Sequence, residues 1–272
     1  MGKFDGILLC TDLDGTLLDN KCTVSQENID AIEYFKKEGG AFTFATGRVP
    51  SGAAIVCDMI KPNVPGIVFN GAGIYDFEKD ESLWDLSLDD GAISVVDHTL
   101  LNFPDMAFIV CTDKKVYFSK VNELIDHYML VENLPLDLTP YKQIPMPWKK
   151  VVFIETPEEI ERLMSVLSAS EYFDKYDFVR STKNYYEFLP KGASKGMGIL
   201  MLAEMLGIKK ERIIAVGDNE NDISMLTASG LGVAVENSHP RVISVADMIT
   251  SSNSNHAIAK IISDLDSGKI TL

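Results

Sequence analysis

Residues 7–18 read ILLCTDLDGTLL, and this stretch decides the fold. Its first four residues are apolar, which is typical of a strand buried on both faces of a parallel sheet. Asp12 and Asp14 follow at the carboxyl end of that strand, and Gly15 and Thr16 then allow a tight turn and supply a hydroxyl. Burying two carboxylates so close together is costly unless a cation or a proton offsets their repulsion. The stretch therefore favours a carboxylate pair that holds Mg²⁺ and a phosphoryl group.

Aspartates after a strand also occur in simpler roles. They often cap a helix or lie in a solvated loop, and Asp12 and Asp14 alone do not exclude that. An EF-hand loop starting at Asp12 is excluded, because Leu17 and Thr23 stand where such a loop needs glycine and glutamate. A Walker-type phosphate loop is excluded as well, since the chain has no glycine-rich loop ending in Gly-Lys-Ser/Thr.

The composition indicates a soluble globular protein. The chain has 272 residues, of which 46% are hydrophobic and 24% charged, and this length suits one large or two modest domains. The formal net charge of −15 argues against a nucleic-acid partner, because a phosphate backbone would be repelled. The same acidity favours divalent cations as partners.

Neither the cysteines nor the apolar runs indicate a secreted or membrane protein. The four cysteines are widely scattered, without Cys-x-x-Cys or histidines at zinc-ligand spacing, so we expect reduced thiols: Cys10, Cys22, Cys57 and Cys111. No apolar run reaches the roughly 18 residues that a membrane span needs, and the first residues lack the apolar region of a signal peptide. We expect a cytoplasmic protein, a monomer or homodimer, without a membrane partner.

Strands and helices alternate after the first strand. Apolar residues at helical spacing predict a helix that begins after Thr23 or Ser25 and ends at Gly39. A short strand over residues 41–45 then ends on Thr46-Gly47-Arg48. Because a strand–helix–strand connection is right-handed, both strands are expected to run parallel, with Thr46 and Asp12 at the same edge.

The same pattern continues through a helix at 51–60 and a strand at 67–69, which ends at Asn70-Gly71. This turn is expected either to line the cleft at that edge or to be an ordinary loop.

The order of elements changes between residues 80 and 189. A charged stretch at 77–81 predicts a crossing between domains, and a hairpin and further strands and helices follow. From Ser194 the alternation resumes, with a helix over 194–206 and strands at 213–216, 231–235 and 248–249. The predicted fold is α/β, a doubly wound Rossmann-like parallel sheet formed by residues 1–79 and 190–272, with an inserted α+β cap domain at 80–189. Function should lie at the carboxyl ends of the strands.

Four short segments converge on that edge in the predicted topology. Each alone is weak, because a single lysine in a helix is usually solvated and a single aspartate after a strand is often a helix cap. The inference that they form one functional site rests on their joint occurrence at this edge. The segments contribute Asp12 and Asp14; Thr46 and Gly47; Lys195; and Asp218, Asn221 and Asp222.

These segments also resemble the four sequence motifs of the haloacid dehalogenase-like hydrolases. The motifs stand here as DxDGT at 12–16, TGR at 46–48, SKG at 194–196 and GDxxND at 217–222. An insertion between the second and third motifs is similar to the C2-type cap of the Cof-type phosphatases. The resemblance covers the whole chain, and none of the motif positions departs from the family pattern.

The resemblance implies roles for the acidic residues. Asp12 would be the nucleophile that attacks phosphorus and forms an aspartyl-phosphate. Asp14 would be the general acid for the leaving alcohol and then the general base for water, and its backbone carbonyl would bind Mg²⁺. Asp12 and Asp218 would be side-chain ligands of Mg²⁺. Asp222 would either ligate the ion directly or orient one of its waters.

The remaining motif residues would bind the phosphoryl group. The Thr46 hydroxyl and the Gly47 amide would donate to its oxygens, and Lys195 would supply positive charge. Asn221 would donate to the same group. For Arg48 two roles stay open, a contact with the substrate or an ion pair with an acid.

The resemblance implies a small phosphorylated metabolite as substrate, such as a sugar phosphate, a nucleotide or a phosphorylated cofactor. The cap domain would exclude water and select the leaving group, and its residues 180–187 would be either a binding surface or ordinary exposed strands. Two other functions stay open: a phosphomutase or phosphotransferase of the same superfamily, and a non-catalytic protein that senses phosphoesters.

Overall fold

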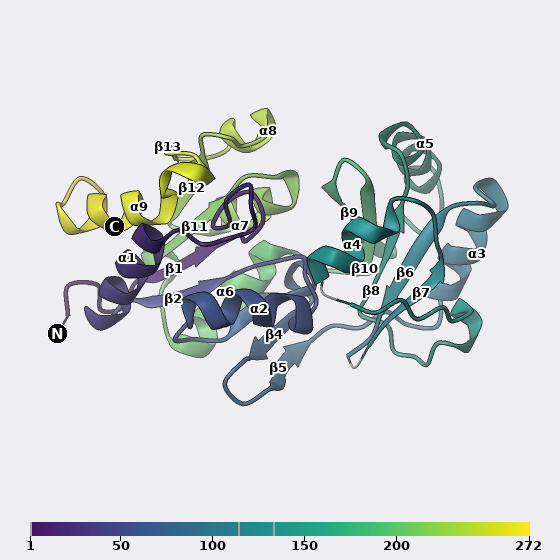
Figure 1. The fold of residues 1–272 in the computed structure, drawn as a ribbon, viewed down its shortest axis with the longest axis horizontal. Coiled ribbons are helices and arrows are strands. Elements are labelled where there is room, and N and C mark those ends of the chain that lie inside the picture. Colours follow the sequence, from purple (N-terminus) through teal and green to yellow (C-terminus); the bar gives the residue numbers. More distant parts are fainter. Residues whose placement is uncertain (1, 114, 133) are drawn as a thin grey trace. The chain divides into compact units, whose positions relative to one another are not determined.

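The computed structural model describes residues 2–113, 115–132 and 134–272. The chain forms two compact units (Figure 1). The first combines the two ends of the chain, Met1–Trp84 and Ser194–Leu272, and the second is the intervening segment Asp85–Ala193.

The first unit contains a sheet of five parallel strands (Figure 1). Their spatial order is β13 (Met248–Thr250), β12 (Leu231–Val235), β11 (Ile213–Gly217), β1 (Leu8–Thr11) and β2 (Ala41–Phe44). β1 lies between β11 and β2, and its Leu8 pairs with Ile213 on one side and Ala41 on the other. The apolar strand that precedes Asp12 is therefore an inner strand of the sheet.

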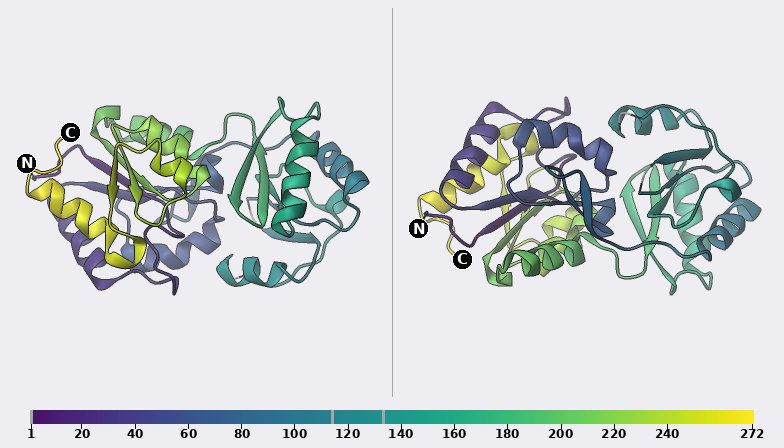
Figure 2. Two further views of the ribbon diagram at one scale, coloured as in Figure 1. Left: turned by 90° about the horizontal axis from the view of Figure 1, so that it is seen from above. Right: turned by 90° about the horizontal axis from the view of Figure 1, so that it is seen from below.

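Helices cover both faces of this sheet (Figures 1 and 2). Side chains of consecutive strand residues point to opposite faces, and Leu8 and Cys10 of β1 pack in one apolar cluster with Ile199 and Leu202 of α6. On the other face α1 and α9 lie side by side. The helices of this unit are α1 (Gln26–Lys37), α2 (Pro50–Ile60), α6 (Lys195–Leu206), α7 (Ile223–Ala228), α8 (Pro240–Ile243) and α9 (Ala257–Asp266). The predicted doubly wound α/β fold is confirmed.

Local sequence signals set the ends of the helices that approach the site. Ser25 is the N-cap of α1 and accepts a hydrogen bond from the backbone N–H of Asn28. Ser194 caps α6 in the same way through the N–H of Met197, so Lys195 is the first residue of that helix. Gly207 ends α6 in the left-handed conformation.

The strand predicted at 67–69 does not continue the parallel sheet. It is β3 (Gly66–Val68), and it forms a separate three-stranded sheet with β4 (Gly73–Asp76) and β5 (Glu81–Asp85). After β3 a sharp 3₁₀ turn at Phe69–Gly71 returns the chain antiparallel to β3, which pairs β3 with β4. An isolated bridge between Ala45 and Ile67 links β3 to the chain just after β2.

The second unit is an antiparallel sheet with its own core. Its strands lie in the order β7 (Val116–Lys120), β6 (Ala107–Cys111), β8 (Lys150–Ile154), β10 (Tyr185–Pro190) and β9 (Tyr176–Thr182). Its helices are α3 (Ala92–Asn102), α4 (Ile125–Glu132) and α5 (Pro157–Ser168). Trp148, Phe153 and Phe188 are fully buried and pack with apolar residues of α3 and α5. Thr156 caps α5 and Pro157 begins it, as the sequence predicts.

Both predicted domain boundaries need a small correction. The units divide at Trp84/Asp85 and Ala193/Ser194, rather than after residues 79 and 189. The first boundary moves because the charged stretch is the turn of a hairpin, so that β5 stays in a sheet with β4. The second moves because β10 extends to Pro190 and pairs there with Tyr176 of β9.

Two further observations concern the helices and the cysteines of the described part of the chain. None of its helices is both long enough and apolar enough to cross a membrane. All four cysteines are free thiols, and Cys22 is the exposed one among them.

Candidate active site

Three neighbouring strands place the predicted residues at one edge of the sheet. Asp12 follows β1, Thr46 follows β2 and Asp218 follows β11. The backbone N–H of Asp12 donates to the carbonyl of Val216 at 2.8 Å, which extends the pairing of β1 with β11 past the strand end. Because the strands are parallel, their carboxyl ends bring these side chains together.

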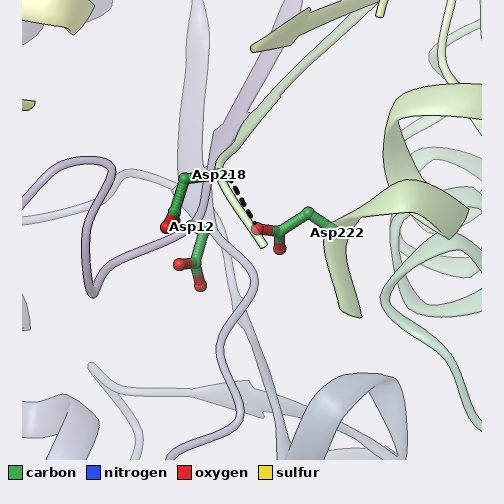
Figure 3. Close-up of side chains that lie close together, drawn as sticks. All are labelled: Asp12, Asp218 and Asp222. Atoms are coloured by element: carbon green, nitrogen blue, oxygen red, sulfur yellow. Dashed lines mark hydrogen bonds between the residues drawn. The ribbon is translucent and has the colours of Figure 1, made fainter. Parts of the chain in front are cut away.

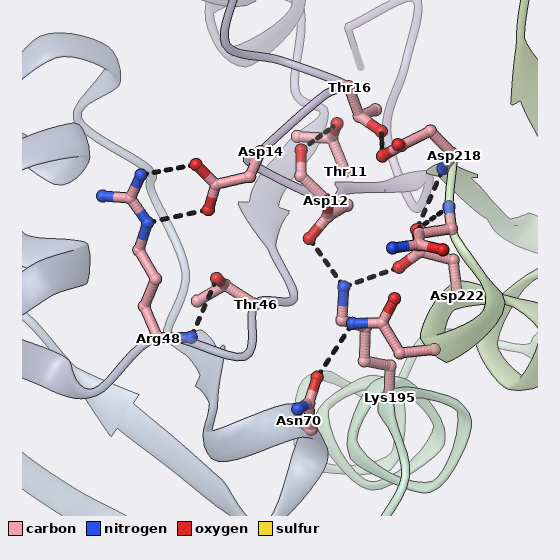
Figure 4. Close-up of polar contacts among 12 residues, drawn as sticks. Thr11, Asp12, Asp14, Thr16, Thr46, Arg48, Asn70, Lys195, Asp218 and Asp222 are labelled. Carbon is pink, nitrogen blue, oxygen red and sulfur yellow. Dashed lines mark hydrogen bonds and ion pairs between the residues drawn. The ribbon is translucent and has the colours of Figure 1, made fainter. Parts of the chain in front are cut away.

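Lys195 joins this group from the first turn of α6. Its Nζ lies 2.6 Å from Oδ1 of Asp12 and 2.6 Å from Oδ1 of Asp222 (Figure 4). The Lys195 side chain is completely buried, and so is that of Asp222. A buried ammonium is stable only with such charged partners, so this contact fixes Lys195 between the first and fourth motifs.

Asp222 is held by the loop in which it lies. Its Oδ2 accepts hydrogen bonds from the backbone N–H groups of Asp218 and Asn219, at 2.9 and 3.0 Å. Together with the bond from Lys195, both of its carboxylate oxygens therefore have protein donors. These bonds fix the backbone that carries Asp218.

Asp218 contacts the loop that follows β1. The Thr16 hydroxyl donates to Oδ1 of Asp218 at 2.7 Å. Gly15 has a φ of +81°, and a Cβ at this position would lie 2.6 Å from Oδ2 of Asp218. A side chain at residue 15 would therefore displace Asp218. Glycine both adopts the positive φ without strain and leaves room for the Asp218 carboxylate.

Asp12, Asp218 and Asp222 form an acidic cluster that could hold a metal ion (Figure 3). One carboxylate oxygen of each lies within 4.8 Å of the others. Three carboxylates with one ammonium leave an excess of negative charge, which a divalent cation would offset. Within the described part of the chain, no hydrogen-bond donor contacts Oδ2 of Asp12 or Oδ2 of Asp218. The donor set, carboxylate oxygens in a buried setting, therefore fits a hard cation such as Mg²⁺.

Burial and mutual repulsion shift the protonation of this cluster. Burial raises the pKa of Asp12 well above its usual range, and the neighbouring carboxylates add to the rise while Lys195 opposes it. Burial and the charge of Asp222 raise the pKa of Asp218 to about 7. Burial alone would lower the pKa of Lys195, but Asp12 and Asp222 outweigh it and raise the pKa. Lys195 therefore stays charged, and a bound cation would favour the ionised aspartates.

Asp14 points away from this cluster. Arg48 donates from Nε and Nη2 to the two carboxylate oxygens of Asp14, at 2.8 and 2.6 Å (Figure 4). The Arg48 side chain is buried and also donates to the carbonyl of Gly52, whereas the Asp14 side chain is 47% exposed. Of the two roles open to Arg48, the structure shows the ion pair with an acid, and that acid is the predicted general acid.

Thr46, Gly47 and Asn221 all lie next to Asn70. The Thr46 hydroxyl accepts a hydrogen bond from the N–H of Arg48 at 3.1 Å. Asn221, predicted to donate to a phosphoryl group, donates from Nδ2 to Oδ1 of Asn70 at 3.0 Å. The Asn70 turn thus lies at the site, which is one of the two alternatives that the sequence leaves open.

Two further asparagines support the loop after β1, and they were not predicted. Asn237 donates from Nδ2 to the carbonyl of Gly15 at 2.8 Å, and Asn253 donates to the carbonyl of Leu18 at 2.9 Å. The N–H of Asn253 in turn donates to Oδ1 of Asn237. Both follow the carboxyl ends of β12 and β13, so the rule that places function at these ends could have found them.

Residues 180–187 form the hairpin of β9 and β10 in the second unit. Arg180 pairs with Glu161 of α5 and donates to the carbonyls of Thr182 and Lys183. Glu187 is buried and pairs with Lys150 at 2.8 Å. Arg180 and Glu187 therefore have structural partners within their own unit.

Comparison with known proteins agrees with the geometry of the site. The sequence profile of haloacid dehalogenase-like hydrolases matches residues 9–262. The chain is 32% identical to the putative phosphatase YxeH of Bacillus subtilis, over 95% of this chain and 97% of that protein. It is 27% identical to the 5-amino-6-(5-phospho-D-ribitylamino)uracil phosphatase YitU of Bacillus subtilis, over 94% of this chain and 96% of that protein.

Solved structures show the same architecture. A haloacid dehalogenase-like hydrolase from B. subtilis superimposes with a TM-score of 0.83 and 25% sequence identity, covering 94% of this chain and 98% of that one. The similarity thus extends through both compact units.

Proposed function

Because the chain belongs to the haloacid dehalogenase-like hydrolases, we propose that it is a Mg²⁺-dependent phosphatase of small phosphorylated metabolites. The observation that carries the proposal is the position of Lys195, whose Nζ contacts Asp12 and Asp222 at 2.6 Å each, beside Asp218. A nucleophilic carboxylate, a fixed positive charge and an acidic cluster that fits a metal ion are then in one place. Phosphoryl transfer through an aspartyl-phosphate uses these three parts.

In the first step, an oxygen of Asp12 attacks the phosphorus of the ester. The bond between phosphorus and the leaving oxygen breaks, and Asp14 gives that oxygen a proton. Asp12 then carries the phosphoryl group as a mixed anhydride. Lys195 offsets the negative charge on Asp12 and on the transferring oxygens.

In the second step, water attacks the phosphorus of the aspartyl-phosphate. Asp14, now ionised, takes a proton from this water, and the bond to Asp12 breaks to release inorganic phosphate. Asp14 is suited to both steps because its side chain is partly exposed and so can meet the leaving group and solvent. The Thr46 hydroxyl and the Gly47 amide hold the phosphoryl oxygens throughout.

Asp12 and Asp218 would hold Mg²⁺ through their side chains and Asp14 through its carbonyl, while Asp222 would orient the ion's water. When bound, Mg²⁺ supplies positive charge that offsets the charge of the three aspartates and of the phosphate ester. The absence of protein donors at Oδ2 of Asp12 and Oδ2 of Asp218, within the described residues, supports this assignment.

The names of two relatives support a substrate class for this chain. YitU is a phosphatase of a phosphorylated ribitylaminouracil by its name, and YxeH is a putative phosphatase. We infer for this chain a phosphate monoester of a sugar, nucleotide or cofactor.

The test is phosphate release from a panel of such esters, with Mg²⁺ or with EDTA, by the wild type and the Asp12→Asn variant. We expect release that requires Mg²⁺ and is lost in the variant. Conversion of an ester into its isomer without phosphate release would show a phosphomutase instead. Binding of esters without turnover would show a sensor.

A further inference from the structure

Asn70 belongs to none of the four motifs, yet it is buried within the site. Its side chain is 2% exposed, and it lies in the turn that follows β3. Figure 4 shows Asn70 among the residues of the site, and its backbone N–H donates to the carbonyl of Thr46. Because a buried amide needs hydrogen-bond partners, the contacts of Asn70 indicate its role.

The backbone of this turn is strained. Phe69, Asn70 and Gly71 have φ angles of +54°, +54° and +93° in succession. Such values are uncommon for residues other than glycine and are outliers for a bulky residue such as Phe69. At Gly71 a Cβ would lie 1.9 Å from the carbonyl oxygen of Ser194, the N-cap of α6. The turn is therefore pressed against the start of the helix that carries Lys195.

Hydrogen bonds tie this strained turn to the second motif. The N–H of Asn70 donates to the carbonyl of Thr46 at 2.9 Å, and the N–H of Phe69 donates to the carbonyl of Arg48 at 3.1 Å. The Asn70 amide also lies against Gly47, where a Cβ would come within 3.1 Å of both amide atoms. Strain of this kind persists only where the surroundings fix it, and it is concentrated at functional sites.

The side chain of Asn70 connects the second motif to the fourth. Its Oδ1 accepts a hydrogen bond from Nδ2 of Asn221 at 3.0 Å. Oδ1 of Asn221 is buried and has no hydrogen-bond partner within the described part of the chain. The hydrogen bond to Asn70 therefore determines which end of the Asn221 amide is the nitrogen and which is the oxygen.

We propose that Asn70 is a positioning residue for phosphoryl binding, which acts by fixing the orientation of the Asn221 amide. A primary amide can rotate so that its nitrogen and oxygen exchange places, and the oxygen end would repel a phosphoryl oxygen. By accepting from Nδ2, Oδ1 of Asn70 keeps the nitrogen end of the Asn221 amide turned toward Asn70. One Nδ2 hydrogen then bonds Asn70, and the second is left to donate to the phosphoryl group. This inference rests on the proposed phosphatase function.

The test is a double-mutant cycle between Asn70 and Asn221. Asn70→Gly removes the amide but keeps a residue that adopts a positive φ without strain, so the turn is retained. We expect this variant to lower kcat/KM and to raise the inhibition constant of inorganic phosphate by about tenfold to a hundredfold, the effect of one hydrogen bond to a charged group. Asn221→Ala should do the same. In the Asn70→Gly background it should have little further effect, because the two residues act as one unit.

A matched control is Asn63→Gly. The amide of Asn63 bonds the N–H of Phe42 and the carbonyl of Gly40, so it too joins loop to strand, away from the motif residues. This variant should lose stability without a change in the inhibition constant of phosphate. The Asn70→Ala background gives the same cycle if the glycine variant does not fold.

Independent, multiplicative effects of the two substitutions would overturn the inference, and so would an Asn70→Gly variant with wild-type phosphate affinity. Either result requires an active wild type. An inactive wild type with a folded chain would instead overturn the proposed phosphatase function, so the two failures are distinguishable.

Discussion

The guanidinium of Arg48 donates to both carboxylate oxygens of Asp14, with donor–acceptor distances of 2.8 and 2.6 Å. This pairing of two parallel hydrogen bonds fixes the plane of the carboxylate as well as its position. Arg48 is itself held by the carbonyl of Gly52. The group proposed to move protons is thus oriented by a buried residue that belongs to a different motif.

Arg48→Lys should therefore impair proton transfer to the leaving group. A lysine keeps the charge but cannot make the two parallel bonds, so Asp14 loses its fixed orientation. We expect kcat to fall about tenfold or more for alkyl phosphates, which need an acid, and much less for aryl phosphates, which do not. Steady-state kinetics on both kinds of ester measure this difference. An equal loss for both would show that Arg48 acts on binding and not on Asp14.

Asp12→Asn should abolish turnover without destabilising the metal-free protein. The asparagine oxygen can still accept from Lys195, and the substitution removes a buried negative charge that Asp218 and Asp222 repel. Urea denaturation in EDTA should show a stability equal to or above that of the wild type. Labelled substrate should leave no covalent phosphate on the variant. Trapped phosphoenzyme in this variant would contradict the role of Asp12 as nucleophile.

The stability of the metal-free protein should depend on pH through Asp218. The pKa of this group is raised from 3.8 to about 7, chiefly by burial, so the folded protein holds its proton more tightly than the unfolded chain does. The contribution of Asp218 to stability should therefore fall as the pH rises from about 4 to about 7 and change little above that. Thermal unfolding in EDTA, compared with Asp218→Asn, isolates this contribution. The difference between the two proteins should be independent of pH if Asp218 does not titrate in this range.

Magnesium should stabilise the protein more at pH 8 than at pH 5. A cation must displace the proton from Asp218 before it binds there, and at pH 8 that proton is already lost. Thermal unfolding with and without Mg²⁺ at both pH values measures the effect. Asp218→Asn is the control, and it should respond weakly to Mg²⁺ at either pH.

Lys195→Met should destabilise the metal-free fold. The variant leaves Asp12 and Asp222 buried without their cation, which costs about 3 kcal/mol or more. Urea denaturation without metal measures this loss, and added Mg²⁺ should recover part of it. Lys175→Met is the control, because Lys175 and its partner Glu171 are both exposed and their ion pair should contribute much less. Equal losses of stability in the two variants would show that the buried ion pairs of Lys195 contribute no more to the free energy of unfolding than an exposed ion pair does.

The strands of the core were predictable because a buried parallel strand leaves a signature in one short stretch. The strands predicted at 41–45 and 213–216 correspond to β2 and β11, and the family match confirms the resemblance seen in the motifs. The right-handed connection rule then sufficed to bring Asp12, Thr46 and Asp218 to one edge. This much follows from local pattern and chain topology.

The contacts that depend on backbone turns were not predictable. β3 meets the chain after β2 in parallel through the bridge between Ala45 and Ile67, as predicted, but its pairing with β4 was not predicted. That pairing follows from the reversal at Phe69–Gly71, which depends on three successive positive φ angles. The same turn decides that Asn221 contacts Asn70. The choice of Asp14 as partner of Arg48 likewise requires coordinates, since both roles of that arginine were compatible with the sequence.

The two neighbours of β1 follow it at very different distances along the chain: β2 comes soon after it, and β11 comes only after the whole second unit. During synthesis on a ribosome, the side of β1 that pairs with β11 therefore has no partner strand until residues 213–217 emerge. The segment Asp85–Ala193, with its own apolar core, is complete before that point. The inserted unit is thus free to fold first, and the unit that carries Asp12 and Asp218 is the last to be assembled.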